Sequence, residues 1–320
     1  MIVKKEEHLS PPTTKYPLYL TSWIHIEPFA EYRTKEGHAL ASRNLKRLGN
    51  VFKEHEAKMT FLSELDFAEA CLKYGNTLEE LEDAGHEVGT HIHGFHIVGL
   101  EEQREYARKR KEAVDRLGVR NITVCGGWNI ENPFKEFVDL GFSVACGYSE
   151  HTPGVKGSRI RGQDLPQAPW RPVEGSGWTT DWMRHDPEGR IVYVPFAGEL
   201  WIDWAEHGRD LRNIPLMESE VKRYVGSWKE VIDSVFSSMV PGKINHRSLY
   251  VTCHEEAIAD YEEMLERQMR SIGEMLDMIR QDYVKTGKVV WETISGVAQK
   301  YIAWESYVDS LSSSQKSLSI

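Results

Sequence analysis

Apolar runs and amphipathic segments alternate along most of the chain. Short runs rich in β-branched and aromatic residues, typical of strands, lie at 16–27, 58–63, 86–91, 121–125, 142–146, 247–253 and 288–291. Between them, apolar residues recur at helical spacing at 40–54, 66–74, 76–83, 100–117, 132–140, 218–239, 255–283 and 292–304. Strands that alternate with helices in this way favour a parallel α/β sheet with right-handed crossovers.

The same pattern predicts how the chain is divided. Residues 1–15 are charged or rich in proline and predict a loose lead-in, whereas 16–304 predict one domain, of a size that single α/β barrels reach. The alternation breaks at 147–215, a Trp- and Gly-rich insertion with a hairpin-like stretch at 178–195. An insertion this long is more often functional than a linker, so we expect it near the active site. The serine-rich segment 305–320 predicts a flexible tail.

Composition indicates the class of protein. With 40% hydrophobic and 28% charged residues, the chain is typical of a globular protein in water, and it has no apolar run long enough for a membrane span. The N-terminus lacks the apolar core of a secretion signal, so a cytoplasmic location is expected. A net charge of −10 argues against a nucleic-acid partner, because phosphate binding needs a basic face. A homo-oligomer is compatible with these features.

The cysteines are scattered and form no C-x-x-C pair, which predicts free thiols in a reducing compartment. They are Cys71, Cys125, Cys146 and Cys253.

The densest candidate chemistry lies at 84–96, A-G-H-E-V-G-T-H-I-H-G-F-H. Three of the chain's 13 histidines, His91, His93 and His96, fall within six residues at the end of a predicted strand. Neutral imidazole is the commonest metal ligand, and a cluster at a strand end can direct several rings at one point. The alternative is a polar loop with surface histidines. The pattern favours metal binding.

Other predicted strands also end in unusual residues. His25 and Glu27 lie two apart and therefore point the same way in extended chain. Trp128 follows the glycines after the fourth strand, and His254 follows a late strand. Because the carboxyl ends of parallel strands form the active face of α/β folds, these residues predict one catalytic site with one metal ion. His254 suits a general acid; the alternative is a cap on the next helix.

These motifs resemble the polysaccharide deacetylase superfamily, whose metal-binding motif is approximately G-H-E-V-G-x-H-x-x-x-H-H. A C-x-G-W segment similar to 125–128, a strand similar to 141–149 and a late H-x-E similar to 254–256 follow in the family's order. The resemblance covers 16 to about 300, and the nearest branch contains lipid-linked formamido-arabinose deformylases. It implies a distorted (β/α) barrel of about seven parallel strands with the Trp/Gly-rich loop-hairpin region inserted.

The resemblance also implies roles for individual residues. Glu27 and His91 fall on metal-ligand positions, and His25 falls on the position of the base, with a role as an extra ligand left open. His254 falls on the general acid. The family's first strand ends in two acids, so His25 and Glu27 depart from its pattern.

The second metal histidine of the family falls on Phe95 in this chain. His96, one residue later, is the favoured substitute, because a shift of one residue in a glycine-containing turn is easily absorbed. His93, two residues after His91, is the alternative.

Together these features predict a metal-dependent hydrolase that cleaves the C–N amide bond of an N-acylated sugar or related carbohydrate through metal-activated water. One divalent ion is expected, zinc before other transition metals. Trp128, Trp170 and Arg171 are candidates for binding the sugar, by stacking and by a planar guanidinium contact. The alternative for each tryptophan is ordinary packing.

Two further functions remain open. The W-I-H-I-E-P-F stretch around Glu27 also resembles the first motif of related barrel glycoside hydrolases, whose chemistry needs a second carboxylate; Asp181 and Asp203 are candidates. The other is a non-catalytic carbohydrate-binding protein that has lost turnover with the altered acid pair.

Overall fold

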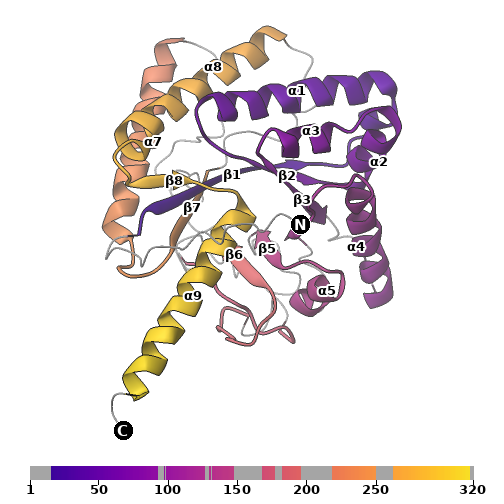
Figure 1. The fold of residues 1–320 in the computed structure, drawn as a ribbon. Helices are drawn as coiled ribbons and strands as arrows, with labels where there is room; N and C mark the ends of the chain where they lie inside the picture. The colour runs from indigo at the N-terminus through magenta and orange to yellow at the C-terminus, as the bar shows by residue number, and fades with distance from the viewer. Residues whose placement is uncertain are drawn as a thin grey trace, which may run out of the picture.

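The computed structural model has at its centre a parallel sheet that curls into an open barrel (Figure 1). The structure describes residues 16–92, 97, 99–126, 130, 132–147, 168–176, 182–195, 218–249 and 262–317. Within them, the strands are β1 Leu18–Ile26, β2 Thr60–Ser63, β3 Glu87–Ile92, β4 Thr123–Gly126, β5 Val144–Gly147, β6 Val192–Pro195, β7 Asn245–Leu249 and β8 Val289–Trp291.

The strands lie in the order β6-β5-β4-β3-β2-β1-β7, and β8 also pairs with β1. Every pairing between these strands is parallel. The first half of β1 pairs with both β7 and β8, whereas Trp23–Ile26 of its second half pairs with β2. A parallel barrel-like α/β fold, expected from the sequence, is therefore confirmed.

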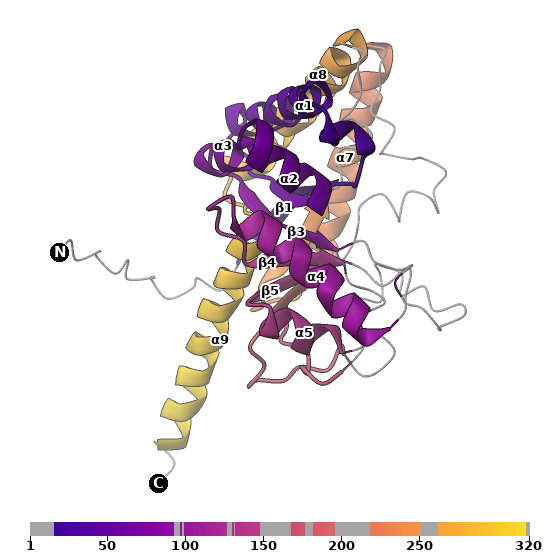
Figure 2. The same cartoon turned by 90° about the vertical axis from the view of Figure 1, so that its right-hand side faces the viewer.

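Helices pack around the sheet, most of them on its outer face, whereas α9 packs against the apolar cluster that contains Tyr19 and Trp23 of β1 (Figures 1 and 2). The helices are η1 Ala30–Arg33, α1 Lys35–Glu54, α2 Leu65–Tyr74, α3 Thr77–Asp83, α4 Leu100–Asp115, α5 Pro133–Asp139, α7 Glu218–Ser238, α8 Glu262–Ile279, the π-helical η3 Arg280–Val284 and α9 Ile294–Ser317. In the described part of the chain, no helix is both long and apolar enough to cross a bilayer.

Alternation along β1 separates two buried environments. Leu18, Leu20, Ile24 and Ile26 belong to the large apolar core that the strands share with the helices outside the sheet. The odd-numbered Tyr19 and Trp23 instead join the apolar cluster inside the barrel. His25 and Glu27 therefore continue the inward-facing row.

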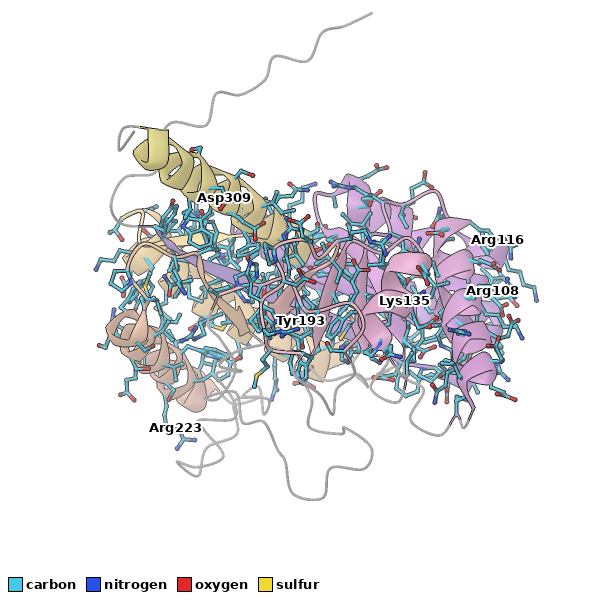
Figure 3. The ribbon with its side chains drawn as sticks, turned by 90° about the horizontal axis from the view of Figure 1, so that it is seen from below. Arg108, Arg116, Lys135, Tyr193, Arg223 and Asp309 are labelled. Carbon is cyan, nitrogen blue, oxygen red and sulfur yellow. The ribbon has the colours of Figure 1, made fainter. Side chains whose placement is uncertain are left out.

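The view from below shows how charge and core are distributed (Figure 3). The buried Tyr193 of β6 lies near the middle of the molecule. Arg108 of α4 and Arg116, just after that helix, lie on one side, and Arg223 of α7 and Asp309 of α9 lie on the other. Ionic side chains thus gather on the outer helices, as hydration of charge requires.

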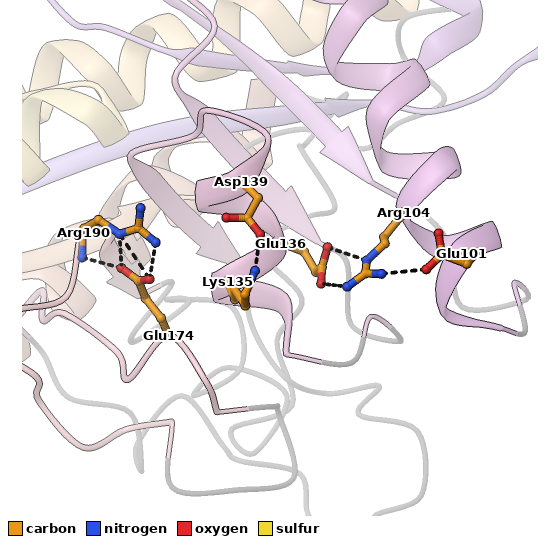
Figure 4. Close-up of polar contacts among 7 residues, drawn as sticks. All are labelled: Glu101, Arg104, Lys135, Glu136, Asp139, Glu174 and Arg190. Atoms are coloured by element: carbon orange, nitrogen blue, oxygen red, sulfur yellow. Dashed lines mark hydrogen bonds and ion pairs between the residues drawn. The ribbon is translucent and has the colours of Figure 1, made fainter.

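Ion pairs connect neighbouring surface elements (Figure 4). The Arg104 guanidinium of α4 donates to both carboxylate oxygens of Glu136 on α5, at 2.8 and 2.7 Å, and to Glu101 at 2.6 Å. Arg190 contacts Glu174 in a similar forked arrangement. Contacts of this kind fix geometry more than they add stability.

Two expectations about the outer regions need correction. The hairpin expected at 178–195 is wrong in its second half: β6 pairs in parallel with β5 and so belongs to the barrel. Both faces of this run are buried, which suits a strand within a parallel sheet. The C-terminal segment, expected to be a flexible tail from 305, continues α9 as far as Ser317. Buried residues in the first turns of α9 nucleate it, and a nucleated helix extends at low cost.

Candidate active site at the carboxyl ends of the strands

The end of β1 supplies two ionisable side chains to the barrel mouth. His25 and Glu27 are each only 7% exposed. Their side chains lie on the same side of the strand, with 3.7 Å between His25 Nδ1 and Glu27 Oε1. The spacing of two residues in extended chain predicted this arrangement.

His91 of β3 joins the same point. It is 1% exposed, and its ring stacks on that of His25 with 4.0 Å between centroids and 18° between planes. His91 Nε2 lies 3.4 Å from Glu27 Oε1. The structure therefore brings together three of the site residues expected from the sequence, although β2 lies between β1 and β3 in the sheet.

Cys125 of β4 is the functional candidate that sequence reasoning missed. It pairs in register with His91 across β3 and β4, and its Sγ lies 3.2 Å from His25 Nε2. One potential ligand atom from each of His25, His91 and Cys125 lies within 4.8 Å of the others. We call His25, Glu27, His91 and Cys125 the mouth cluster.

The two imidazoles of the mouth cluster have opposite electrostatic environments. Burial, reinforced by the neighbouring His91, lowers the pKa of His25 to about 4. Burial also opposes protonation of His91, but contacts with Cys125 and Glu27 outweigh it and raise its pKa to about 10. The surroundings therefore disfavour the protonated form of His25 and favour that of His91.

The pKa values of the two neighbouring thiols, Cys125 and Cys146, are also shifted in opposite directions. Burial would raise the pKa of Cys125, but a hydrogen bond with Cys146 and the nearby His25 hold it well below its usual range. Burial and the contact with Cys125 raise the pKa of Cys146. Cys125 is thus the thiol of this pair that can serve as a thiolate, the form that binds metals and attacks electrophiles.

The donors of the mouth cluster fit a divalent metal ion. Imidazole nitrogen, thiolate sulfur and carboxylate oxygen are the ligand types of zinc, and a catalytic zinc site uses three of them and leaves a position open. The cluster also lies at the carboxyl ends of parallel strands, where α/β folds place their active sites. A mixed nitrogen and sulfur set favours zinc or another thiophilic ion over magnesium or calcium.

Trp170 and Arg171 lie in a different neighbourhood. The Trp170 indole is buried against Trp182 and Tyr193, and its Nε1 donates to the Trp182 carbonyl. The Arg171 guanidinium donates to Glu305 of α9 at 2.7 Å and to the Gly189 carbonyl at 2.8 Å. Both side chains make internal contacts of the kind that the packing alternative expects, and sugar binding by them stays a prediction.

Several other candidates lie outside the described residues, and for them the sequence-based predictions stand alone. They are His93, His96, Trp128, Asp181, Asp203 and His254.

Comparison with known proteins identifies the fold. No family model matches the chain, and no curated protein matches it. Among solved structures, a protein named as a polysaccharide deacetylase from Mycobacterium smegmatis is similar at 13% identity and a TM-score of 0.57, over 92% of this chain and 93% of that one. Puue allantoinase is similar at 14% identity and a TM-score of 0.56, over 92% and 94%.

A 4-alpha-glucanotransferase from Thermococcus litoralis also matches, at 13% identity and a TM-score of 0.56, over 89% of this chain and 40% of that one. Likeness at such low identity concerns the fold and not the reaction. This chain shares the barrel architecture of polysaccharide deacetylases and of other barrel enzymes.

Proposed function

We propose that the protein is a metal-dependent hydrolase that cleaves the C–N amide bond of an N-acylated sugar or related carbohydrate. The observation that carries the proposal is the mouth cluster: two imidazoles, a thiol and a carboxylate meet within a few ångströms at the active end of the barrel. The named deacetylase with the same architecture and the sequence motif at 84–96 support carbohydrate amides as the substrate class.

The residues of the mouth cluster divide the work of hydrolysis. A divalent ion held by the cluster would polarise the acyl carbonyl and lower the pKa of water bound to it. Two groups are placed to take a proton: the neutral imidazole of His25 and the carboxylate of Glu27. Protonation of the leaving amine is assigned to His254 on the sequence motif alone.

The experiment is an assay of acetate or formate release from N-acetylated and N-formylated amino sugars, with the zinc-loaded protein. His91→Ala should lose both the bound ion and the release of acid. His55→Ala is the matched control, since His55 pairs with Asp277 on the surface, and it should retain both. Release that survives removal of all metal would contradict the proposal.

The same assay separates the two alternatives. Glycoside hydrolysis needs two carboxylates about 5–9.5 Å apart, and the mouth cluster contains only one, Glu27. Reducing sugar formed without free acid would favour that chemistry. Sugar binding without either product would favour a non-catalytic carbohydrate-binding protein.

A further inference from the structure

The position of Cys125 differs from that of a packing thiol. Cys71 of α2 is also buried, but it lies in the apolar core among residues of the helices and the outer sheet face. Cys125 also borders an apolar cluster, but its Sγ lies 3.2 Å from His25 Nε2 and its backbone is in register with His91. A thiol beside two imidazoles can bind a metal ion together with them, a role that is not open to Cys71.

We propose that Cys125 is a metal ligand and that, with His25 and His91, it forms a His₂Cys site for a thiophilic divalent ion, with Glu27 outside the ligand set. The inference rests on the proposed function, because it takes the mouth cluster as the metal centre of that activity. It assigns a thiolate to a site where the sequence motif implies only carboxylate and imidazole ligands.

The geometry of His25 supports this ligand set. Its two ring nitrogens face different partners: Nε2 lies beside Cys125, and Nδ1 lies 3.7 Å from Glu27. Histidines that bind metals through one nitrogen commonly direct the other at a carboxylate, which fixes the orientation of the ring. Glu27 also faces His91 at 3.4 Å, so one carboxylate can orient both imidazole ligands.

The inference also decides between the two candidate bases. An imidazole that donates its lone pair to a metal cannot accept a proton with it, so His25 is occupied when the ion is bound. Glu27 keeps a carboxylate beside the site and becomes the proton acceptor. Three protein ligands leave a position open for water and substrate, as in other catalytic zinc sites.

Cobalt titration of the full-length protein tests the ligand set directly. Apo protein should bind one equivalent of Co²⁺ and develop a near-ultraviolet thiolate-to-cobalt charge-transfer band. Cys125→Ala should abolish the band and lower affinity by more than the roughly 10–100-fold typical of losing an outer-shell partner. The matched control is Cys71→Ala, which removes the buried thiol of α2 in the apolar core and should keep the band.

Glu27→Gln gives the complementary result. It should keep the charge-transfer band and weaken cobalt binding by about 10–100-fold, as expected for a carboxylate that supports ligands without being one.

X-ray absorption of the unmutated zinc protein removes any dependence on how the variants fold. One sulfur at about 2.3 Å and nitrogen at about 2.0–2.1 Å are expected. A shell without sulfur, a cobalt complex without the band, or a band that survives Cys125→Ala would overturn the inference. Acid release with no sulfur ligand would leave the proposed function standing, whereas a sulfur-ligated ion with no acid release would refute the function alone.

Discussion

Two buried glutamates face the barrel interior at opposite ends of its strands, and their partners differ in kind. Glu87 begins β3 at the floor of the barrel. Its carboxylate accepts hydrogen bonds from the hydroxyls of Thr60 and Thr123, at 2.9 and 2.5 Å, and from the backbone N–H of Ser295 at 3.1 Å. Glu27, just beyond β1 at the mouth, faces His25 and His91.

We expect this difference to separate a structural carboxylate, Glu87, from a reactive one, Glu27. The donors to Glu87 are neutral groups fixed by two strands and by the N-terminus of α9, where the helix dipole also favours negative charge. The groups facing Glu27 can gain, lose or share protons and can bind a metal. Burial is nearly equal, at 6% and 7% exposure, so the partners and not the burial distinguish function.

Removing the mouth carboxylate should affect turnover most. Glu27→Gln is expected to lower acid release by about 10²–10⁴-fold, the contribution of a general base, because the amide cannot accept the proton. Rates should be measured per folded protein, with unfolding followed in parallel. A decrease in acid release that is fully explained by a smaller amount of folded protein would contradict a catalytic role for Glu27.

Removing the floor carboxylate should affect stability instead. Glu87→Ala leaves two hydroxyls and a helix N-terminal amide without their acceptor, and should lower the free energy of unfolding by about 3–5 kcal/mol. Urea unfolding measures this, with Glu69→Ala on the exposed face of α2 as the control. A change below about 1 kcal/mol would show that Glu87 is not the structural counterpart of Glu27.

Gly89 lies on the inward face of β3, between Glu87 at the floor of the barrel and His91 at its mouth. A Cβ at this position would lie 2.6 Å from the Thr123 carbonyl oxygen and 3.0 Å from Leu62. Gly89→Ala should therefore destabilise by about 2–3 kcal/mol through overpacking.

Gly226→Ala in α7 is the matched control, since a Cβ there meets nothing within 4 Å. It should stabilise by up to about 1 kcal/mol. Equal thermal unfolding midpoints for the two variants would contradict the overpacking expected at position 89.

A histidine outside the mouth gives the smallest effect. His86 Nδ1 accepts from the Met59 N–H, its Nε2 contacts the Gly49 carbonyl at 3.0 Å, and burial lowers its pKa to about 4. The unfolded chain, with a pKa near 6.5, binds more protons between these values, so His86 contributes stability above pH 6.5 that is lost as the pH falls toward 4.

Between pH 7 and 5, the His86 contribution should fall by about 2 kcal/mol. In His86→Gln, where the amide can replace both contacts without titrating, this part of the pH dependence should vanish from urea unfolding curves. Identical pH profiles for variant and wild type would contradict it.

The residues of the mouth cluster were not equally predictable from the sequence. Alternation along β1 was enough to place His25 and Glu27 on one face, and the apolar step before His91 placed that residue at a strand end. Cys125 escaped because a thiol within an apolar run is typical of core packing. Its role depends on the register of β3 with β4, which periodicity does not encode.

Long-range packing also determined contacts that the sequence did not predict. Trp170 and Arg171 have the composition of a sugar-binding pair, but their contacts with Trp182 and Glu305 come from segments 12 and 134 residues away. The serine-rich end of α9 has weak helix propensity, and its anchored first turns carry it as far as Ser317. The local sequence pattern predicts the helices and strands and which side chains share a face, whereas contacts between distant segments determine what each side chain does.

The most direct test of the mouth cluster as the metal centre of an amide hydrolase is acid release by chelator-treated wild-type protein, measured as zinc is added back. Release of acetate or formate from N-acylated amino sugars should be absent from the apo protein and should rise to a plateau at one equivalent of zinc. Undiminished release by the apo protein would contradict the account.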